Sequence, residues 1–250
     1  METETTETQQ NNQPGCKGCL NILFIFQFPI TLIVAGIFFP ETIPFKIFGF
    51  WNTSKAVDGI IAGLPMLLWT LVVNFIGQFV IRKLIERNPE MKEANDERIA
   101  QSLASHPGYL LITSVFEEVA FRWVMFLGGI PLLKIINHLF FGFAGIGIFE
   151  RLHIYIIGPI ADFTTFGYLH NFLFHEHGWA VGASLLSSNA VFRDGHKYQG
   201  WFGYFNAWFA GMYVFYIALN YSLLSAIAIH IAGNYTALIL IRLYERFRED

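Results

Sequence analysis

The sequence predicts an all-α, polytopic membrane protein, a helix bundle of about six transmembrane helices around a polar intramembrane cavity. Three observations support this class. Of the 250 residues, 54% are hydrophobic and only 14% are charged, whereas a soluble domain has roughly 25% charged residues. The mean hydropathy is +0.45. Several apolar stretches also reach the roughly 20 residues that are needed to cross a bilayer.

The charge balance and the cysteine content exclude other classes. The net charge is −3 and no basic block occurs, so we expect the lipid bilayer and no nucleic acid as a partner. Two cysteines, Cys16 and Cys19, cannot form a disulfide framework. A soluble globular enzyme and a disordered chain do not fit this composition.

Seven apolar stretches are candidates for membrane spans, and they cover residues 20–39, 59–81, 108–129, 131–149, 153–174, 201–220 and 221–241. Residues 1–19 are predicted to be a disordered polar tail, because they are acidic and of low complexity. Residues 20–107 then comprise two transmembrane helices and a charged cytoplasmic loop over 82–106. Residues 108–242 hold the remaining spans, and residues 243–250 form a charged tail.

The number of spans depends on whether 131–149 crosses the membrane. If it does, seven spans place 7 Lys and Arg residues on the N-terminal side and 8 on the other, which shows no bias. If it lies in the interface, six spans give 11 against 4. Because cytoplasmic loops carry an excess of Lys and Arg, we expect six spans with both termini cytoplasmic. Eight spans would give the same placement of the termini.

Ionisable residues inside the apolar stretches are expected to be paired or functional, because a charge at the bilayer centre costs at least about 2.5–3.5 kcal/mol. Glu118 and Arg122 are four residues apart, so their side chains can pair on a helix. Glu117 is rotated by about 100° from Glu118 and has no local partner. A carboxylate in this position needs a distant partner or a proton, and both conditions suit a general base.

Two further helices each carry a histidine. Phe166 and His170 are four residues apart, and so are His230 and Asn234. A His with an Asn one turn away can bind a water molecule, a metal or a carbonyl oxygen, although a lone His is more often a packed interior residue. Asp162 lies two turns before His170, where it either orients a partner in the cavity or has a buried structural role.

The stretch 175–200 contains His175, Glu176, His177 and His196. HEH is not the HExxH motif, and alternate residues do not share a helical face. We therefore expect loop or interface residues here and no metal ligands.

Three motifs in order resemble those of the CPBP family of intramembrane proteases, which includes the type II CAAX prenyl endopeptidases and the bacteriocin-processing, or Abi, proteins. EEVAFR is similar to the family's EExxxR motif, FGYLH to FxxxH, and HIAGN to HxxxN. The resemblance covers about residues 108–240 and makes 108–242 the catalytic core. It implies an endopeptidase whose cavity opens toward the cytosol and whose substrate is a membrane-associated protein or peptide, including prenylated CAAX-type substrates.

By this resemblance, Glu117 activates a water molecule for attack on a peptide carbonyl, and the cavity is also lined by His170, His230 and Asn234. Supporting roles fall to Glu118, Arg122 and Phe166. Two schemes remain open. In the first, Zn²⁺ bound by Glu117, His170 and His230 lowers the pKa of a bound water. In the second, no metal is used, and His and Asn donors stabilise the oxyanion directly.

Two other functions remain alternatives to proteolysis. A non-catalytic immunity or assembly factor on the same scaffold would keep the polar core for binding. A proton-coupled transporter would use the Glu and His side chains as a relay. Transporters commonly have repeats and broken spans in matching halves, and the sequence shows neither.

Overall fold

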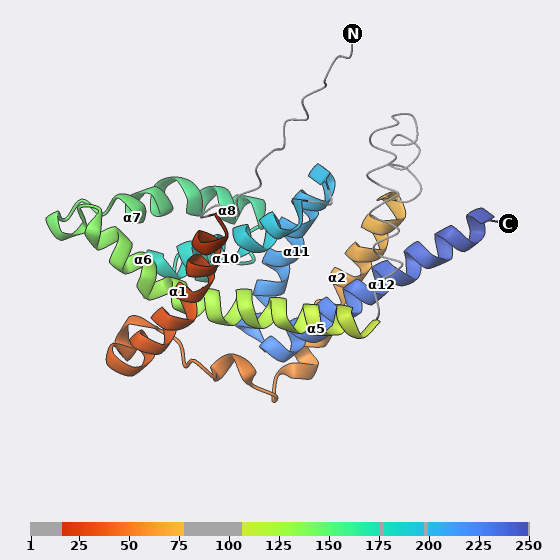
Figure 1. The fold of residues 1–250 in the computed structure, drawn as a ribbon, viewed down its shortest axis with the longest axis horizontal. Coiled ribbons are helices and arrows are strands. Elements are labelled where there is room, and N and C mark those ends of the chain that lie inside the picture. Colours follow the sequence, from red (N-terminus) through yellow and green to blue (C-terminus); the bar gives the residue numbers. More distant parts are fainter. Residues whose placement is uncertain (1–16, 78–106, 176–177, 198–199, 250) are drawn as a thin grey trace, which may run out of the picture.

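A computed structural model of the protein describes residues 17–77, 107–175, 178–197 and 200–249 (Figure 1). Every regular element in these ranges is a helix, which confirms the all-α prediction for this part of the chain. Four helices are long and apolar enough to cross a membrane: Ala56–Ile76, Pro107–Leu139, Trp201–Asn220 and Leu223–Tyr244. The protein is therefore an integral membrane protein, while six spans and cytoplasmic termini stay predictions.

The N-terminal part consists of two long helices and the segment that joins them. Helix α1 (Lys17–Phe38) begins inside the tail predicted over 1–19, so the last residues of that tail are helical. It ends just before Pro40, as expected because a proline disfavours helical backbone in the preceding residue. The connection holds η1 (Pro40–Thr42) and η2 (Gly49–Trp51) before α2 (Ala56–Ile76). The predicted loop over 82–106 lies outside the described residues.

One continuous helix replaces two stretches that the sequence separates. It is formed by α5 (Pro107–Glu117), the π-helical segment η4 (Glu118–Met125) and α6 (Phe126–Leu139). The division between 108–129 and 131–149 is therefore wrong, because Pro131 is buried within the helix. Neighbouring side chains can satisfy backbone groups near such a proline. Ser184 does so by donating a hydrogen bond to the Phe126 carbonyl oxygen at 2.6 Å.

The stretch predicted as a span over 153–174 is interrupted. A second composite helix contains α7 (Ile148–Leu152), the π-helical η6 (His153–Ile157) and α8 (Gly158–Thr164), after the short η5 (Gly142–Ala144). The chain then turns through left-handed backbone at Phe166 and Gly167, with φ of 52° and 75°. Helix α9 (His170–Leu173) is a single turn.

Three helices complete the structure, and the first was not predicted. Helix α10 (Trp179–Gly195) occupies most of the stretch 175–200, for which the sequence analysis predicted no helix, and His175 and His196 lie outside it. Helix α11 (Gly200–Asn220) follows it. Helix α12 (Leu223–Glu249) continues through the predicted tail 243–250, which is rich in the helix formers Leu, Arg and Glu.

Close packing of α2 against α12 fixes the helix that carries His230 (Figure 1). Gly59 and Gly63 form a GxxxG pattern, which lets helix backbones approach closely in membranes. A Cβ atom at Gly59 would lie 2.3 Å from Ser225 Oγ, and one at Gly63 would lie 2.3 Å from Ile229 Cγ1. Ser225 also donates a hydrogen bond to the Ala56 carbonyl oxygen at 2.9 Å.

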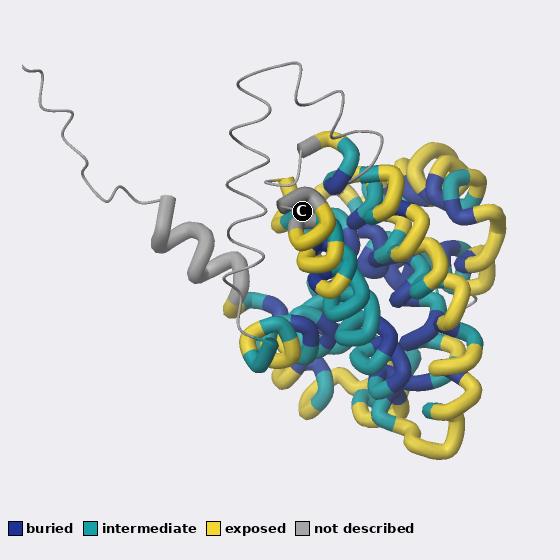
Figure 2. Tube along the Cα trace, turned by 90° about the vertical axis from the view of Figure 1, so that its right-hand side faces the viewer, coloured by how far each residue is buried: buried dark blue, intermediate teal, exposed yellow. Residues whose placement is uncertain are grey.

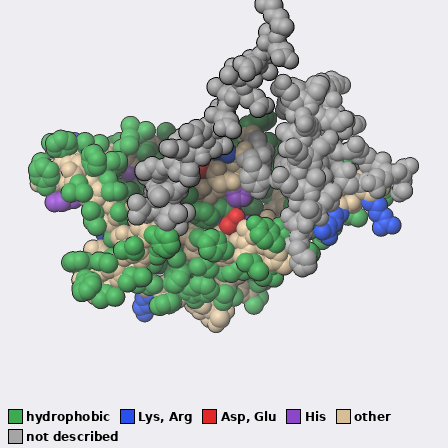
Figure 3. Space-filling view, in the orientation of Figure 1, with side chains coloured by type: hydrophobic (Ala, Val, Ile, Leu, Met, Phe, Trp, Pro, Cys, Tyr) green, Lys and Arg blue, Asp and Glu red, His purple; other side chains and the backbone are tan. Residues whose placement is uncertain are grey.

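Buried residues line the inner faces of the helices, and exposed residues lie on the outside (Figure 2). The exposed side chains are largely apolar, as the described part of one face shows (Figure 3). Phe163 is 84% exposed and Ile37 is 67% exposed. Contiguous apolar surface of this kind marks contact with a membrane or another protein, and lipid is the partner that long apolar helices require.

We expect Gly128→Ala to destabilise the protein by about 1–3 kcal/mol through overpacking. A Cβ atom at Gly128 would lie 2.3 Å from the backbone oxygen of Phe28 in α1, and backbone atoms cannot rotate away. Thermal unfolding in detergent measures the loss. Gly77→Ala is the matched control, because no atom of the described residues lies within 4 Å of a Cβ there. Equal melting temperatures for the two variants would contradict the close approach of α1 and α6.

Candidate functional site

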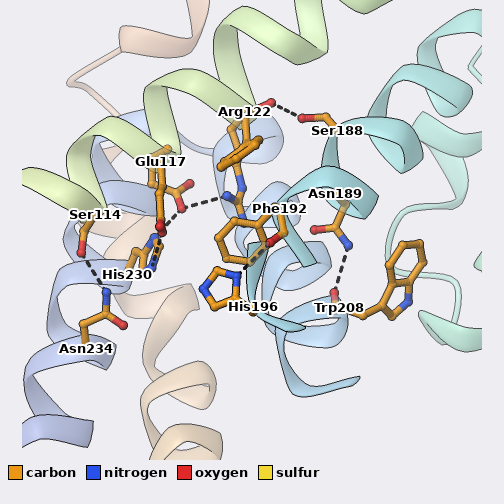
Figure 4. Close-up of polar contacts among 12 residues, drawn as sticks. Ser114, Glu117, Arg122, Ser188, Asn189, Phe192, His196, Trp208, His230 and Asn234 are labelled. Atoms are coloured by element: carbon orange, nitrogen blue, oxygen red, sulfur yellow. Dashed lines mark hydrogen bonds and ion pairs between the residues drawn. The ribbon is translucent and has the colours of Figure 1, made fainter. Parts of the chain in front are cut away.

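Five of the predicted site residues meet where the helix of residues 107–139 passes α12 (Figure 4). Glu117 ends α5, and Glu118 and Arg122 lie in η4. His230 and Asn234 lie one turn apart on α12. The structure thus brings together side chains that are more than 100 residues apart in the sequence.

Glu118 holds both a histidine and an arginine. Its Oε1 atom accepts a hydrogen bond from His230 Nδ1 at 2.6 Å and lies 3.3 Å from Arg122 Nη1. The side chains of Glu118 and Arg122 are completely buried. Because Glu118 is paired with an arginine, it is the acceptor, and we infer the Nδ1–H tautomer for the neutral form of the His230 ring. In that tautomer the Nε2 atom is an acceptor.

Arg122 lies among aromatic rings as well as beside Glu118. Its Cζ atom is 4.0 Å from the ring centroid of Phe192 and 5.4 Å from that of Phe215. No hydrogen-bond acceptor for the guanidinium occurs among the described residues. The ring faces therefore supply cation–π attraction, which is strongest where water is excluded. Phe192 also contacts the His230 ring, with 6.0 Å between the ring centroids.

Glu117 occupies the more open side of the same histidine. Its side chain is 23% exposed, and its Oε2 atom lies 3.6 Å from His230 Nε2. In the tautomer inferred above, a carboxylate oxygen and a ring nitrogen face each other as two acceptors. Such a pair can accept both hydrogens of a single water molecule, with each hydrogen bond near the usual length of about 2.8 Å.

Asn234 is oriented by a serine that the sequence analysis missed. Its Nδ2 atom donates to Ser114 Oγ at 2.9 Å, and Ser114 Oγ donates in turn to the Leu110 carbonyl oxygen at 2.7 Å. Ser114 is fully buried. The sequence feature that indicates a role for Ser114 is its position four residues before Glu118, on the same side of an apolar helix. The Asn234 amide keeps one N–H for another acceptor.

Helix α10 supports η4 from the other side. Ser188 Oγ donates to the Phe121 carbonyl oxygen at 2.5 Å, so a side chain of α10 satisfies a backbone group of the π-helical segment. Asn189 Nδ2 donates to the Trp208 carbonyl oxygen at 3.1 Å and links α10 to α11. π-Helical segments such as η4 are frequent at functional sites. In the sequence, close packing of this helix against its neighbours is indicated by the small residues of AVGASLLSSNA, residues 180–190.

The FxxxH motif lies elsewhere in the structure. His170 is 59% exposed, and its Nδ1 atom is 3.0 Å from Asp162 Oδ2. Phe166 is 85% exposed in the turn after α8. The structure therefore does not place His170 and Phe166 beside Glu117 and His230, because the helix ends at Thr164 and the motif does not share one helical face. Asp162 pairs with His170 in this separate region, outside the cluster of Glu117 and His230.

The predicted zinc ligands do not form a set in this arrangement. Within the described ranges, no three His, Cys, Asp or Glu side chains are close enough to hold a metal ion. Glu117 and His230 face each other, but His170 pairs with Asp162 instead. A catalytic zinc ion needs three protein ligands, so these residues as placed do not fit Zn²⁺.

No family model, curated protein or solved structure matches this chain.

Proposed function

We propose that the protein is a membrane-embedded endopeptidase that hydrolyses a peptide bond with a water molecule activated by Glu117. One observation carries the proposal. Glu117 and Glu118 are neighbours with separate tasks: Glu118 pairs with Arg122 and His230 Nδ1, whereas Glu117 faces His230 Nε2 at 3.6 Å. One buried and one partly exposed carboxylate that face the two ring nitrogens of the same histidine are suited to acid–base chemistry.

The residues support a sequence of proton and bond changes. A water molecule bound between Glu117 and His230 Nε2 gives one proton to Glu117 as its oxygen forms a bond to the carbonyl carbon. The carbonyl oxygen takes the displaced electron pair, and the free N–H of Asn234 can donate a hydrogen bond to it. Glu117 then gives its proton to the amide nitrogen as the C–N bond breaks. Glu118 and Arg122 hold His230 in its orientation throughout.

The surroundings of the site favour a membrane-associated substrate. The site lies on two helices that are apolar and long enough to cross a bilayer, so a peptide anchored in the membrane can reach it without leaving lipid. The resemblance to the CPBP family supports a prenylated CAAX-type peptide as the first substrate to test.

A non-catalytic immunity or assembly factor is the second candidate. The complete burial of Glu118 and its hydrogen bond to His230 favour it, because a closed polar contact of this kind can hold η4 against α12 without any reaction. Cleavage by the purified protein separates the two functions.

The test uses the full chain in proteoliposomes with a farnesylated CAAX peptide and a panel of unmodified transmembrane peptides. Mass spectrometry detects new peptide termini. We expect cleavage by the wild type and a strongly reduced rate of cleavage by Glu117→Gln. A chelator arm tests the zinc scheme, since loss of activity that zinc restores would show a metal ligand set other than the one described. An inactive wild type on every peptide would support the non-catalytic function.

A further inference from the structure

A second polar feature lies at the α1–α2 connection. An open pocket of about 520 Å³ is lined by Glu41, Ile43, Pro44, Phe45, Lys46 and Lys134. Lys134 is 17 residues after Glu117 on the same helix, which corresponds to about 25 Å along the helix axis. The pocket is therefore separate from the site of Glu117 and His230.

The pocket carries an excess of positive charge. Lys46 and Lys134 face it together with one acid, Glu41. Lys134 is half-buried, and its Nζ atom donates to the Thr42 carbonyl oxygen at 3.1 Å. No described acidic side chain forms an ion pair with either lysine, so the ammonium groups keep N–H donors for another acceptor. A lysine in an apolar helix calls for an anionic partner.

The segments that line the pocket also carry exposed apolar side chains. Phe39 and Phe48 in the connection are 53% and 72% exposed, and Ile135 and Leu139 on α6 are 53% and 68% exposed. Aromatic rings beside lysines are typical of the membrane–water interface. A ligand with an anionic head and an apolar tail would match both parts of this surface.

We propose that this pocket binds the phosphate of an anionic phospholipid. The phosphate oxygens accept hydrogen bonds from Lys46 and Lys134, and the acyl chains run along the exposed apolar side chains of α6. Glu41 can accept a hydrogen bond from a hydroxyl group of a glycerol head, and the two lysines favour a head without a cation of its own. Lysine ammonium groups at a membrane surface attract anionic lipid heads by charge and by hydrogen bonding to the phosphate.

Native mass spectrometry of the full chain tests the proposal, with dioleoylphosphatidylglycerol and dioleoylphosphatidylcholine added in separate titrations. We expect the glycerol lipid to bind more tightly. Lys46→Gln and Lys134→Gln should each weaken its binding by about five-fold, which is the effect of one basic residue near an anionic lipid. Lys134→Arg keeps the charge and should keep the binding. Lys55→Gln, an exposed lysine outside the pocket, is the matched control.

Inorganic phosphate serves as a third ligand, because it shares the phosphate but lacks the chains. Phosphate that binds as tightly as the lipid would overturn the lipid assignment. Equal binding of the two lipids, or equal effects of Lys55→Gln and Lys134→Gln, would overturn the pocket itself. Melting temperatures of the variants near the wild-type value show that a loss of binding does not reflect unfolding.

Discussion

Glu117→Gln is expected to lower the rate of peptide hydrolysis by about 100- to 10,000-fold, the usual contribution of a general base. Glutamine keeps the size and the hydrogen-bonding shape of the side chain but cannot take up the proton of the attacking water. The melting temperature should stay close to that of the wild type, because Glu117 is 23% exposed and the buried ion pair belongs to Glu118. Initial rates and thermal unfolding of the same preparation measure the two effects.

Two further glutamates serve as controls for this variant. Glu118→Gln should lose stability as well as activity, since it leaves Arg122 buried without an anion. Glu150→Gln, in α7 and outside both the site and the pocket, should keep the wild-type rate. Full activity of Glu117→Gln would show that Glu117 is not the base.

Arg122→Met is expected to destabilise the fold by about 3–5 kcal/mol, the range for breaking a buried ion pair from one side. Methionine fills much of the same apolar space between Phe192 and Phe215 but removes the charge that balances Glu118. Equilibrium unfolding in mixed micelles gives the change in the free energy of unfolding.

A double variant shows whether the loss comes from the unpaired carboxylate. Glu118→Gln combined with Arg122→Met removes both charges, so it should be more stable than the sum of the two single variants predicts. Lys197→Met is the surface control, because Lys197 is 62% exposed and pairs with the exposed Asp194, and such pairs contribute about 0–1 kcal/mol. Equal losses for Arg122→Met and Lys197→Met would rule out a buried ion pair.

The sequence predicted the parts of the site that depend on helix spacing alone. Glu118 with Arg122 and His230 with Asn234 are pairs of this kind, and each stays on one helix in the structure. The partnership between Glu118 and His230 depends instead on how α12 packs against α5 and η4, and no local pattern contains that information.

The two main differences from the sequence analysis have local causes. Helix α10 was missed because Ser184, Ser188 and Asn189 interrupt its apolar pattern, although these polar groups bond to backbone oxygens of neighbouring helices. His170 was misplaced because the motif spacing assumes an unbroken helix, whereas Phe166 adopts left-handed backbone. Both cases involve backbone geometry that a hydropathy pattern does not record.

The π-helical turn between Glu118 and Met125 joins the part of the helix that forms the site to the part that packs in the core. Glu117, just before this turn, and Glu118, its first residue, face α12. Phe126, Leu127 and Ile130, which follow the turn, are buried in the core. A wider turn changes the angular register between the two parts. Removing one residue from it would rotate everything that follows by about 100° and would turn that apolar set toward lipid. The length of this segment is therefore under stronger constraint than the identity of most side chains within it.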